Sequence, residues 1–260
     1  MIDKSTNEDF KKKIQDHFDK QQLKANLDEF IPNSVDRYLR GPFEYIQDNH
    51  FKDLNEKKIL DYCCGSGLNS VLLSKLGARV TGMDISKESV DIAIKRFKKH
   101  NLKDYEFYQM DAHSLNFKDN YFDLVVCYKS LLYLNLDKAF SELNRVMKND
   151  AKLIILENIG DNFIFNYYRF IKHILRSRKY PFELNKLKSK DIVVSTKLFY
   201  NYENVYFDFF TILGKFVQDV FKIKISYKFL SFLDKFLLRK LKLRFLPFTL
   251  IKVLKKNTTY

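Results

Sequence analysis

One short run of residues constrains this chain more than any other, the segment 59–69 with the sequence ILDYCCGSGLN. It has the pattern of a buried strand that ends near Asp61 and turns on Gly65 and Gly67 into a helix. Such a turn brings backbone N–H groups and a helix N-terminus close to a ligand. Further along, the segment 79–84 (RVTGMD) reads as a second strand ending in Asp84. Strand, glycine turn, helix, strand and acid in this order are typical of a nucleoside-binding α/β unit.

The first 160 residues predict strands and helices in alternation. Two polar or amphipathic helices are expected at 10–30 and 34–48. Strands are then expected at 58–63, 79–83, 105–109, 122–127 and 151–157, and helices at 68–76, 87–99 and 137–147, with Ser86 as an N-cap and a turn at 148–150. This alternation predicts a parallel sheet that is covered by helices on both faces and wound right-handedly.

The composition indicates a folded protein without a disulfide framework. Hydrophobic residues make up 46% of the 260-residue chain, which has three cysteines and neither a CxxC pair nor a His-rich cluster. We therefore expect a reducing compartment and no metal site. The polar N-terminus lacks the apolar segment of a secretion signal, and no apolar run reaches the roughly 18 residues that a membrane span needs. These features predict a cytoplasmic protein.

Positive charge is concentrated in the last hundred residues. The formal net charge is +14, and residues 161–260 hold 21 of the 46 Lys and Arg but only 7 of the 32 Asp and Glu. This shift marks a functional boundary near Gly160. We expect an N-terminal helical cap at 1–50, a cofactor-binding core at 51–160, and a basic, aromatic-rich substrate-side region at 161–260 that completes the sheet. A basic surface of this kind is either simply solvated or binds an anionic partner.

Three carboxylates follow three strands of the predicted sheet. Asp61, Asp84 and Asp111 each lie where a strand ends, so they are expected to rim one cleft. The dinucleotide pattern GxGxxG fails because Ser70 replaces the third glycine, and no Walker sequence follows the turn. Asp84 suits ribose hydroxyls, Asp111 an adenine amine and Asp61 an α-amino group. Together they favour an adenosyl amino acid over a pyrophosphate, although a single Asp after a strand is often only a turn residue.

The chain resembles the class I S-adenosylmethionine-dependent methyltransferases, in the subgroup with a ubiquinone/menaquinone methyltransferase-like core. The resemblance covers residues 55–160 and rests on four motifs in order, ILDYCCGSG at 59–67, VTGMDIS at 80–86, MDA at 110–112 and YFDLVVC at 121–127. It implies a Rossmann-like, mostly parallel sheet of seven strands with helices on both faces. The seventh strand is antiparallel and forms a hairpin with the sixth, expected at 204–213 and 248–254.

The resemblance also implies S-adenosylmethionine as the cofactor and a set of residues around it. This set is Asp61, Cys63, Gly65, Gly67, Asp84, Ile85, Asp111, Ala112 and Cys127. Asp61 would hold the methionine ammonium, Asp84 the ribose hydroxyls and Asp111 the adenine amine. The two glycines would let the backbone approach the methionine portion, and Ile85 and Ala112 would contact the adenine. Cys127 would lie under the methyl group, and Cys63 stands where many members carry glycine.

The expected chemistry asks little of the protein. A sulfonium is already an activated methyl donor, so transfer needs in-line approach, exclusion of water and, for an oxygen acceptor, removal of a proton. His113 is a candidate base because histidine titrates near neutral pH, and the alternative is a histidine with a structural role at a helix start or one on the surface. Tyr128 and Tyr133 are further candidates for the reacting centre, and the alternative for both is packing or shaping of the substrate site.

The absence of two known motifs narrows the class of acceptor. The Asn/Asp-Pro-Pro-Tyr box is absent after strand 122–127, where YKS stands, and so is the Pro-Cys nucleophile of pyrimidine methyltransferases. A small or lipid-linked acceptor, with or without a phosphate and methylated on oxygen, carbon or nitrogen, is compatible with these absences. Two alternatives stay open. One is an RNA methyltransferase whose basic half follows phosphates, and the other is a non-catalytic partner subunit with a methyltransferase fold.

Two features of the C-terminal region bear on which partner it binds. Residues 162–170 are rich in aromatic side chains and are followed by basic ones. Residues 226–242 form a basic amphipathic helix whose expected apolar face holds Phe229, Leu230, Leu233, Phe236, Leu237 and Leu241. This face either packs on the sheet or lies in the interface of an anionic membrane. The second reading predicts peripheral association with the inner membrane face.

Overall fold

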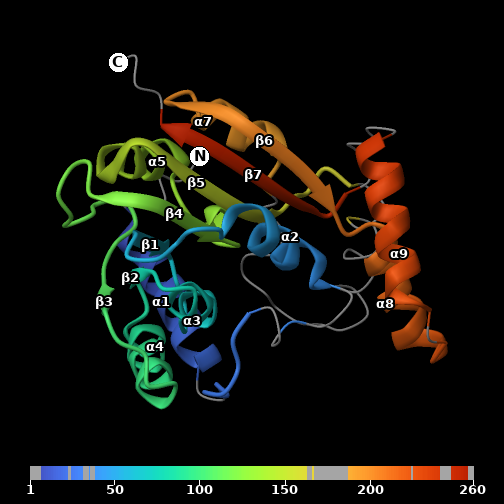
Figure 1. The fold of residues 1–260 in the computed structure, drawn as a ribbon, viewed down its shortest axis with the longest axis horizontal. Helices are drawn as coiled ribbons and strands as arrows, with labels where there is room; N and C mark the ends of the chain where they lie inside the picture. Colours follow the sequence, from blue (N-terminus) through green and yellow to red (C-terminus); the bar gives the residue numbers. More distant parts are fainter. Residues whose placement is uncertain are drawn as a thin grey trace.

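The computed structural model describes residues 7–22, 25–31, 35, 39–162, 166, 187–223, 225–240 and 247–256. Its seven strands are β1 (Lys58–Tyr62), β2 (Arg79–Asp84), β3 (Tyr105–Gln109), β4 (Phe122–Tyr128), β5 (Met147–Asn158), β6 (Phe199–Phe207) and β7 (Thr249–Lys256). They form one sheet in the order β3-β2-β1-β4-β5-β7-β6 (Figure 1). The first five strands pair in parallel, and β7 is antiparallel to both β5 and β6. The predicted fold class is therefore confirmed.

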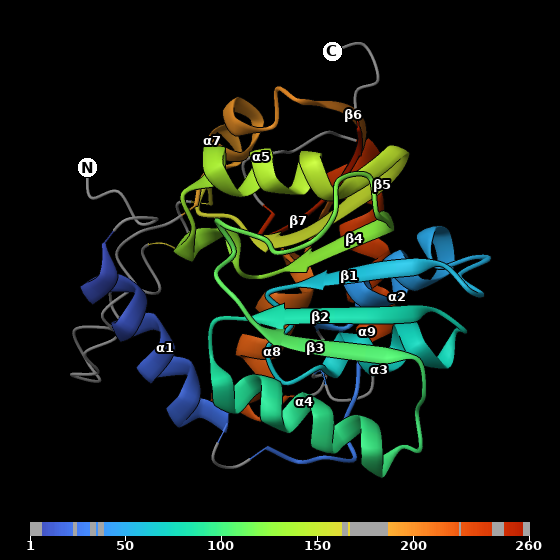
Figure 2. The same cartoon turned by 90° about the vertical axis from the view of Figure 1, so that its left-hand side faces the viewer.

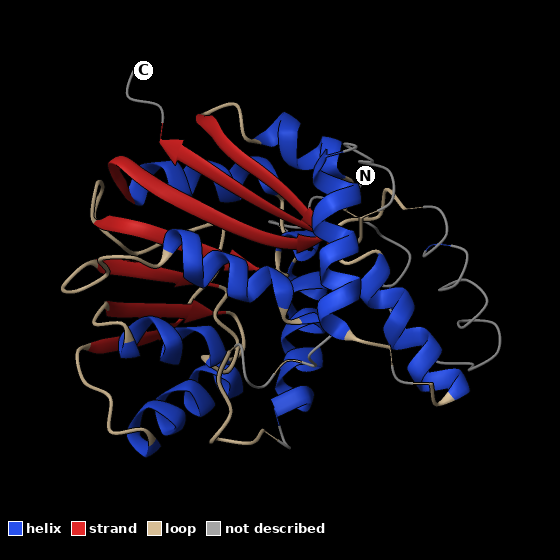
Figure 3. Ribbon diagram, turned by 45° about the vertical axis from the view of Figure 1, so that its right-hand side comes forward, coloured by secondary structure: helices blue, strands red, loops and turns tan. Residues whose placement is uncertain are grey.

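Helices cover both faces of the sheet (Figure 3). They are α1 (Glu8–Gln22), α2 (Gly41–His50), α3 (Leu68–Lys75), α4 (Lys87–Lys99), α5 (Leu136–Val146), α7 (Ser189–Ser195), α8 (Phe210–Phe221) and α9 (Tyr227–Leu233). Side chains of α2, α3 and α4 share a core with one face, and those of α5 and α7 share a core with the other. Among the helices that the structure describes, none is both long enough and apolar enough to span a membrane.

The central strands are apolar on both sides because both faces are covered. In β4, Leu124 and Val126 pack toward α2 and α3, whereas Val125 and Cys127 pack toward α5. All four side chains are almost completely buried. Continuous apolar runs of this kind are typical of parallel strands inside an α/β protein. The same burial leaves only the ends of the strands free to carry polar groups, and this directs function to the edge where the strands end.

Helix α1 runs across the carboxyl ends of the parallel strands (Figure 2). Its neighbour in space is α4, which begins at the predicted N-cap Ser86, whose hydroxyl accepts the Ser89 N–H at 3.0 Å. A side-chain cap at this position satisfies one of the free N–H groups of the first helical turn. The N-terminal segment therefore covers the edge of the sheet to which the predicted site belongs.

Several element boundaries differ from the sequence predictions. The sixth strand is Phe199–Phe207 rather than 204–213, because Asp208 has a left-handed φ of 68° and α8 begins two residues later. The predicted turn at 148–150 is part of β5, with Asp150 at φ 62°. Helix α1 ends at Gln22 instead of residue 30, and α2 begins at Gly41 instead of residue 34. The aromatic segment 162–170 lies almost entirely outside the described residues.

The helix predicted at 226–242 is divided into two parts. It consists of α9 and a π-helical stretch, η3 (Asp234–Lys240), and residues 241 and 242 are not among those described. The wider turn of the π-helix changes which side chains share a face. Leu230 in α9 and Leu238 in η3 are buried, but Phe229 and Phe236 of the predicted apolar face are exposed. The prediction of a single apolar face was wrong.

Asp234 joins α9 to α8 at the point where the helix type changes. Its carboxylate accepts the backbone N–H groups of Phe209, Phe210 and Thr211 at 2.8–3.2 Å and the Thr211 hydroxyl at 2.9 Å. A carboxylate here satisfies the free N–H groups of the first turn of α8 and interacts well with the helix dipole. The two helices are thus fixed to each other as a hairpin.

Candidate active site

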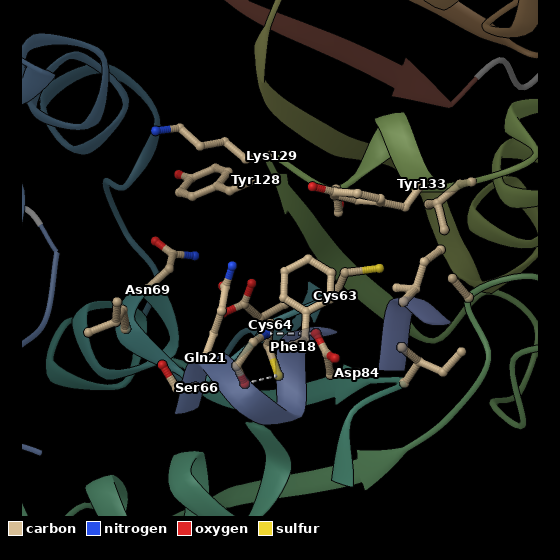
Figure 4. Close-up of a pocket in the computed structure, with 18 of the residues that line it drawn as sticks. Phe18, Gln21, Cys63, Cys64, Ser66, Asn69, Asp84, Tyr128, Lys129 and Tyr133 are labelled. Carbon is tan, nitrogen blue, oxygen red and sulfur yellow. Dashed lines mark hydrogen bonds between the residues drawn. The ribbon is translucent and has the colours of Figure 1, made fainter. Parts of the chain in front are cut away.

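A cavity of about 440 Å³ opens at the carboxyl ends of β1, β2 and β4. This size falls within the roughly 300–1,000 Å³ range of small-molecule sites. Of the predicted site residues, Asp61, Cys63, Gly65, Asp84, Ile85, Asp111, Ala112, His113, Tyr128 and Tyr133 line it. Figure 4 shows several of them pointing into the same space. Gly67 and Cys127 do not line the cavity.

The glycine turn after β1 has the backbone geometry that its sequence predicts. Cys63, Gly65 and Gly67 have φ values of 57°, 52° and 73°, in the region that glycine adopts most easily. A Cβ at Gly65 would meet no atom within 4 Å, so the cavity comes directly up to its backbone. A Cβ at Gly67 would lie 2.9 Å from the Ala93 Cβ. Gly65 therefore leaves room for a ligand, and Gly67 lets α3 pack against α4.

Asp84 holds the glycine turn in place. One carboxylate oxygen accepts the Gly65 N–H and the other accepts the Ser86 N–H, both at 2.9 Å. Burial raises the pKa of Asp84, and the two backbone N–H groups act in the opposite direction. Each oxygen retains acceptor capacity beyond these bonds. A buried carboxylate with free lone pairs at this edge is suited to accept hydrogen bonds from the hydroxyl groups of a ligand.

Asp61 is a buried acid at the bottom of the cavity. It accepts a hydrogen bond from the Ser70 hydroxyl, and only 2% of the residue is exposed. Burial raises its pKa to about 7, the hydrogen bond from Ser70 and the nearby Asn69 amide lower it although Asn69 does not reach hydrogen-bond geometry, and the charge of Asp84 raises it further. Asn69 also lines the cavity, is 5% exposed, and neither of its amide atoms has a hydrogen-bond partner among the described residues. Both side chains would gain from a polar ligand.

Asp111 and His113 form one hydrogen-bonded unit. Asp111 Oδ1 accepts from the backbone N–H of His113 at 2.9 Å and lies 2.7 Å from its Nδ1. His113 Nε2 accepts the Asn135 N–H at 2.9 Å, so the ring proton is on Nδ1. Both ring nitrogens are therefore engaged in structural bonds. This geometry supports the structural reading of His113 and not its prediction as a base.

Helix α1 supplies a partner for Asp111 that the sequence analysis missed. Lys11 Nζ lies 2.8 Å from Asp111 Oδ2. Although partial burial acts to raise the pKa of Asp111, its contacts with His113 and Lys11 hold that pKa below its usual value. Phe18 also reaches across from α1 and packs edge-on against Tyr133, with ring centroids 5.3 Å apart. Helix α1 thus closes one side of the cavity.

The end of β4 places alternate side chains in different surroundings. Cys127 points into the core on the α5 side, with its sulfur 3.1 Å from the Ser130 Oγ, and burial raises the pKa of its thiol. The next residue, Tyr128, lines the cavity and packs edge-on against Phe43, and Lys129 follows it there. Burial also raises the pKa values of Tyr128 and Tyr133, which opposes their acting as bases. The period of two along a strand explains this difference.

Arg96 connects the glycine turn to the N-terminal segment. Its guanidinium, on α4, donates to the carbonyl oxygens of Ser66 at 2.9 Å, Asn26 at 2.6 Å and Glu29. Only 1% of the residue is exposed. The sequence did not indicate that Arg96 is buried, because lysines and arginines on helices are mostly exposed. Arg96 therefore fixes two segments that line the cavity.

The fold and site define a class of protein, a doubly wound α/β enzyme with a nucleoside site at the carboxyl ends of its strands. Comparison with known proteins agrees. Residues 60–155 match the family described as "Methyltransferase domain". The malonyl-[acyl-carrier protein] O-methyltransferase of Buchnera aphidicola is 32% identical over 182 residues, which are 68% of this chain and 68% of the relative. The chain belongs to the class I S-adenosylmethionine-dependent methyltransferases, as its sequence motifs predicted.

Two further matches cover different shares of the chain. The demethylmenaquinone methyltransferase of Thermotoga maritima is 34% identical over 113 residues, 42% of this chain. The chain spans about half of that relative, 47% of its length. The crystal structure of a geranyl diphosphate C-methyltransferase from Streptomyces coelicolor has a TM-score of 0.67, covering 95% of this chain and 98% of that one at 12% identity. This last likeness is one of fold.

Proposed function

We propose that this enzyme transfers the methyl group of S-adenosylmethionine to a small or lipid-linked acceptor that bears a phosphate or another anionic group. The observation that carries the proposal is the meeting of Asp61, Asp84 and Asp111 with the open backbone of Gly65 around one cavity. In this proposal Asp84 accepts the ribose hydroxyls and Asp61 faces the methionine ammonium. Asp111 accepts the adenine amine at a lone pair that Lys11 and His113 leave free.

The protein contributes position and a dry site rather than a base. When bound, the cofactor supplies a methyl group on a cationic sulfur, and the acceptor atom bonds to this carbon while the electrons of the carbon–sulfur bond stay on sulfur. Helix α1 and the Phe18–Tyr133 contact keep water from one side of the cavity. Exclusion of water and correct orientation are large contributions to such a reaction. An acceptor that needs little help with its proton fits the site best.

The lining of the cavity favours an acceptor with an apolar part. Apolar side chains from several elements contribute to it, namely Ile14, Phe18, Ile31, Val35, Phe43, Leu68 and Leu134. Two relatives are named for acting on demethylmenaquinone and malonyl-[acyl-carrier protein], and the structural neighbour for acting on geranyl diphosphate. An acceptor with both an apolar chain and an anionic group would suit this lining and these relationships.

Labelled methyl donor tests the proposal directly. Purified protein would be incubated with methyl-labelled S-adenosylmethionine and with the lipid, RNA and small-molecule fractions of a cell extract. Label in the lipid or small-molecule fraction supports the proposal, whereas label in RNA supports the alternative RNA methyltransferase. The variant Asp84→Ala is the control for label that other proteins of the extract transfer. Absence of label from all three fractions, with cofactor bound, contradicts the proposal.

The affinity for S-adenosylhomocysteine is expected to rise about tenfold between pH 6 and pH 8. Burial raises the pKa of Asp61 to about 7 from 3.8, so the free protein holds this group mostly protonated at pH 6 and mostly ionised at pH 8. An ammonium group binds the ionised form. Calorimetry of wild type and Asp61→Asn checks this, because the variant should lose the pH dependence. 5′-Methylthioadenosine, which lacks the ammonium, should show none with either protein, and an equally steep dependence in Asp61→Asn would rule out this role.

We propose further that the hairpin of α8 and α9 lies on an anionic membrane. Large apolar side chains are exposed along it, with Phe221, Phe229 and Phe232 exposed by 62%, 55% and 59%. Exposed lysines accompany them, with Lys222 and Lys228 between Phe221 and Phe229, and Lys235 on η3 directly after α9. This mixture of aromatic and basic side chains suits the interface of an anionic bilayer. Helix α9 begins beside α2, because a Cβ added at Gly41 would lie 3.2 Å from Tyr227 Oη, and in this proposal a lipid acceptor reaches the cavity from this side.

Replacing Phe229 and Phe232 together by serine is expected to weaken binding to vesicles of phosphatidylglycerol and phosphatidylcholine at least about tenfold, because two half-exposed rings lose their apolar burial in the bilayer. Sedimentation with vesicles measures the bound fraction. Tyr200→Ser is the matched control, since Tyr200 is 65% exposed on β6, away from the hairpin. Binding should also fall as salt is raised. Equal binding of wild type and the double variant would contradict the membrane proposal.

A further inference from the structure

Lys129 places a positive charge inside the cavity. It follows β4 directly, with a left-handed φ of 56°, and its backbone N–H donates to the Leu156 carbonyl at 2.8 Å. Its side chain lines the cavity and is exposed, while desolvation by the neighbouring protein atoms lowers its pKa. A non-glycine residue in this backbone conformation is uncommon and is often found at functional sites.

The ammonium of Lys129 has no ion pair or hydrogen bond among the described residues. It lies over the ring of Phe43, whose centroid is 5.3 Å from Nζ. Lys252 gives the contrast, because it is buried and has Asn201 and Asn204 as acceptors at 2.9 Å and 3.2 Å. Lys129 is exposed, so its ammonium is open to an anion that enters the cavity.

Two buried acids, Glu157 and Asp208, act on the pKa of Lys129 through their charge, but both make their hydrogen bonds to other residues. Glu157 Oε1 accepts the Leu131 N–H at 2.9 Å. Asp208 accepts the hydroxyls of Thr249 at 2.6 Å and Thr211 at 3.3 Å. Burial raises the pKa of each acid to about 7, so neither is a full negative charge near neutral pH. The charge of Lys129 is therefore only partly offset by the protein.

A second polar side chain without a partner lies toward the same part of the cavity. Asn69 is 5% exposed, lines the cavity, and has no hydrogen-bond partner for either amide atom among the described residues. Figure 4 shows Lys129, Tyr128 and Asn69 on one side of the pocket, with Asp84 and Tyr133 on the other. A cation and an amide donor together provide what a carboxylate or phosphate needs.

We infer that Lys129, with Asn69, forms an anion-binding subsite that holds a carboxylate or phosphate group beside the β4 end of the cavity. This inference rests on the proposed function and deepens it. Two sources can supply the anion, the acceptor or the carboxylate of the methionine part of the cofactor. Lys129 is a binding and positioning residue here, because it fixes where one end of a ligand lies relative to the acids on β1 and β2.

Calorimetry with three probes tests the subsite. The probes are S-adenosylhomocysteine, 5′-methylthioadenosine, which has the same nucleoside but no carboxylate, and inorganic diphosphate added to protein with or without S-adenosylhomocysteine. Lys129→Met removes the charge at similar length, and Lys129→Arg retains it. Lys87→Met on α4 is the matched control, since that side chain is 67% exposed. Thermal unfolding of each variant confirms that it is folded.

We expect Lys129→Met to weaken at least one anionic probe tenfold or more, with Lys129→Arg close to wild type and 5′-methylthioadenosine changed less than twofold. Weaker diphosphate binding identifies the acceptor's anion as the ligand, and weaker S-adenosylhomocysteine binding identifies the methionine carboxylate. Unchanged affinity for both anionic probes overturns the subsite. A wild-type protein that binds no S-adenosylhomocysteine overturns the proposed function instead, and diphosphate added alone then still tests Lys129.

Discussion

Replacing Asp84 with alanine is expected to weaken the binding of S-adenosylhomocysteine by about a hundredfold or more. A hydrogen bond to a charged group contributes about 1.5–3 kcal/mol, and the proposed ribose site uses two of them. The change also removes the acceptor for the Gly65 and Ser86 N–H groups, so the glycine turn loses its support. Calorimetric titration measures the loss.

Two further variants separate the effects of Asp84. Asp84→Asn keeps the shape and some acceptor capacity but loses the charge, so its affinity should lie between wild type and alanine. Asp91→Ala is the matched control, because Asp91 is a half-exposed acid on the neighbouring helix α4, with 49% of its side chain accessible. An affinity that is the same in Asp84→Ala and wild type would show that the ribose lies elsewhere.

Replacing Arg96 with alanine is expected to lower the free energy of unfolding by about 3–5 kcal/mol. Each buried polar group that loses its partner costs about 1–3 kcal/mol, and here the carbonyl groups of Ser66, Asn26 and Glu29 all lose one. Urea unfolding followed by circular dichroism measures the change. The affinity for S-adenosylhomocysteine should fall as well, because Ser66 belongs to the glycine turn.

The matched control for Arg96 is another arginine of the same half of the protein. Arg79 is 56% exposed and pairs with Glu56, which is 61% exposed, at the start of β2. Surface pairs contribute about 0–1 kcal/mol, so Arg79→Ala should change stability little. A stability of Arg96→Ala within 1 kcal/mol of wild type would contradict the structural role given to Arg96.

The core of the fold was predictable because its signals are local. The run 59–69 contains both the strand and the glycines that end it, and the boundaries of β1, β2, β3 and α4 agree closely with the prediction. Asp61, Asp84 and Asp111 could be placed together because parallel strands of one sheet end at the same edge. Nothing beyond the order of strands was needed for that step.

The parts that were missed depend on contacts between distant residues. Strand β6 was expected to continue to residue 213, but Asp234 caps α8 from across the hairpin and turns 210–213 into helix. Lys11 and Phe18 line the cavity, but no local sequence pattern predicted this, because α1 has the sequence of an ordinary polar helix. The hydrogen bond to Nε2 of His113 comes from the backbone N–H of Asn135, which is far along the chain, so it could not be predicted either. Sequence spacing alone does not determine such partners.

The strand order has a consequence for how the protein is made. Strand β7 is inserted between β5 and β6, although it is the last of the seven strands in the chain. A nascent polypeptide emerging from the ribosome therefore exposes one edge of β5, and β6 has no neighbour, until residues 249–256 have been synthesised. Unpaired edges of this kind are sites of aggregation. The synthesis of residues 249–256 is thus the step that pairs β5 and β6 with β7 and completes the sheet.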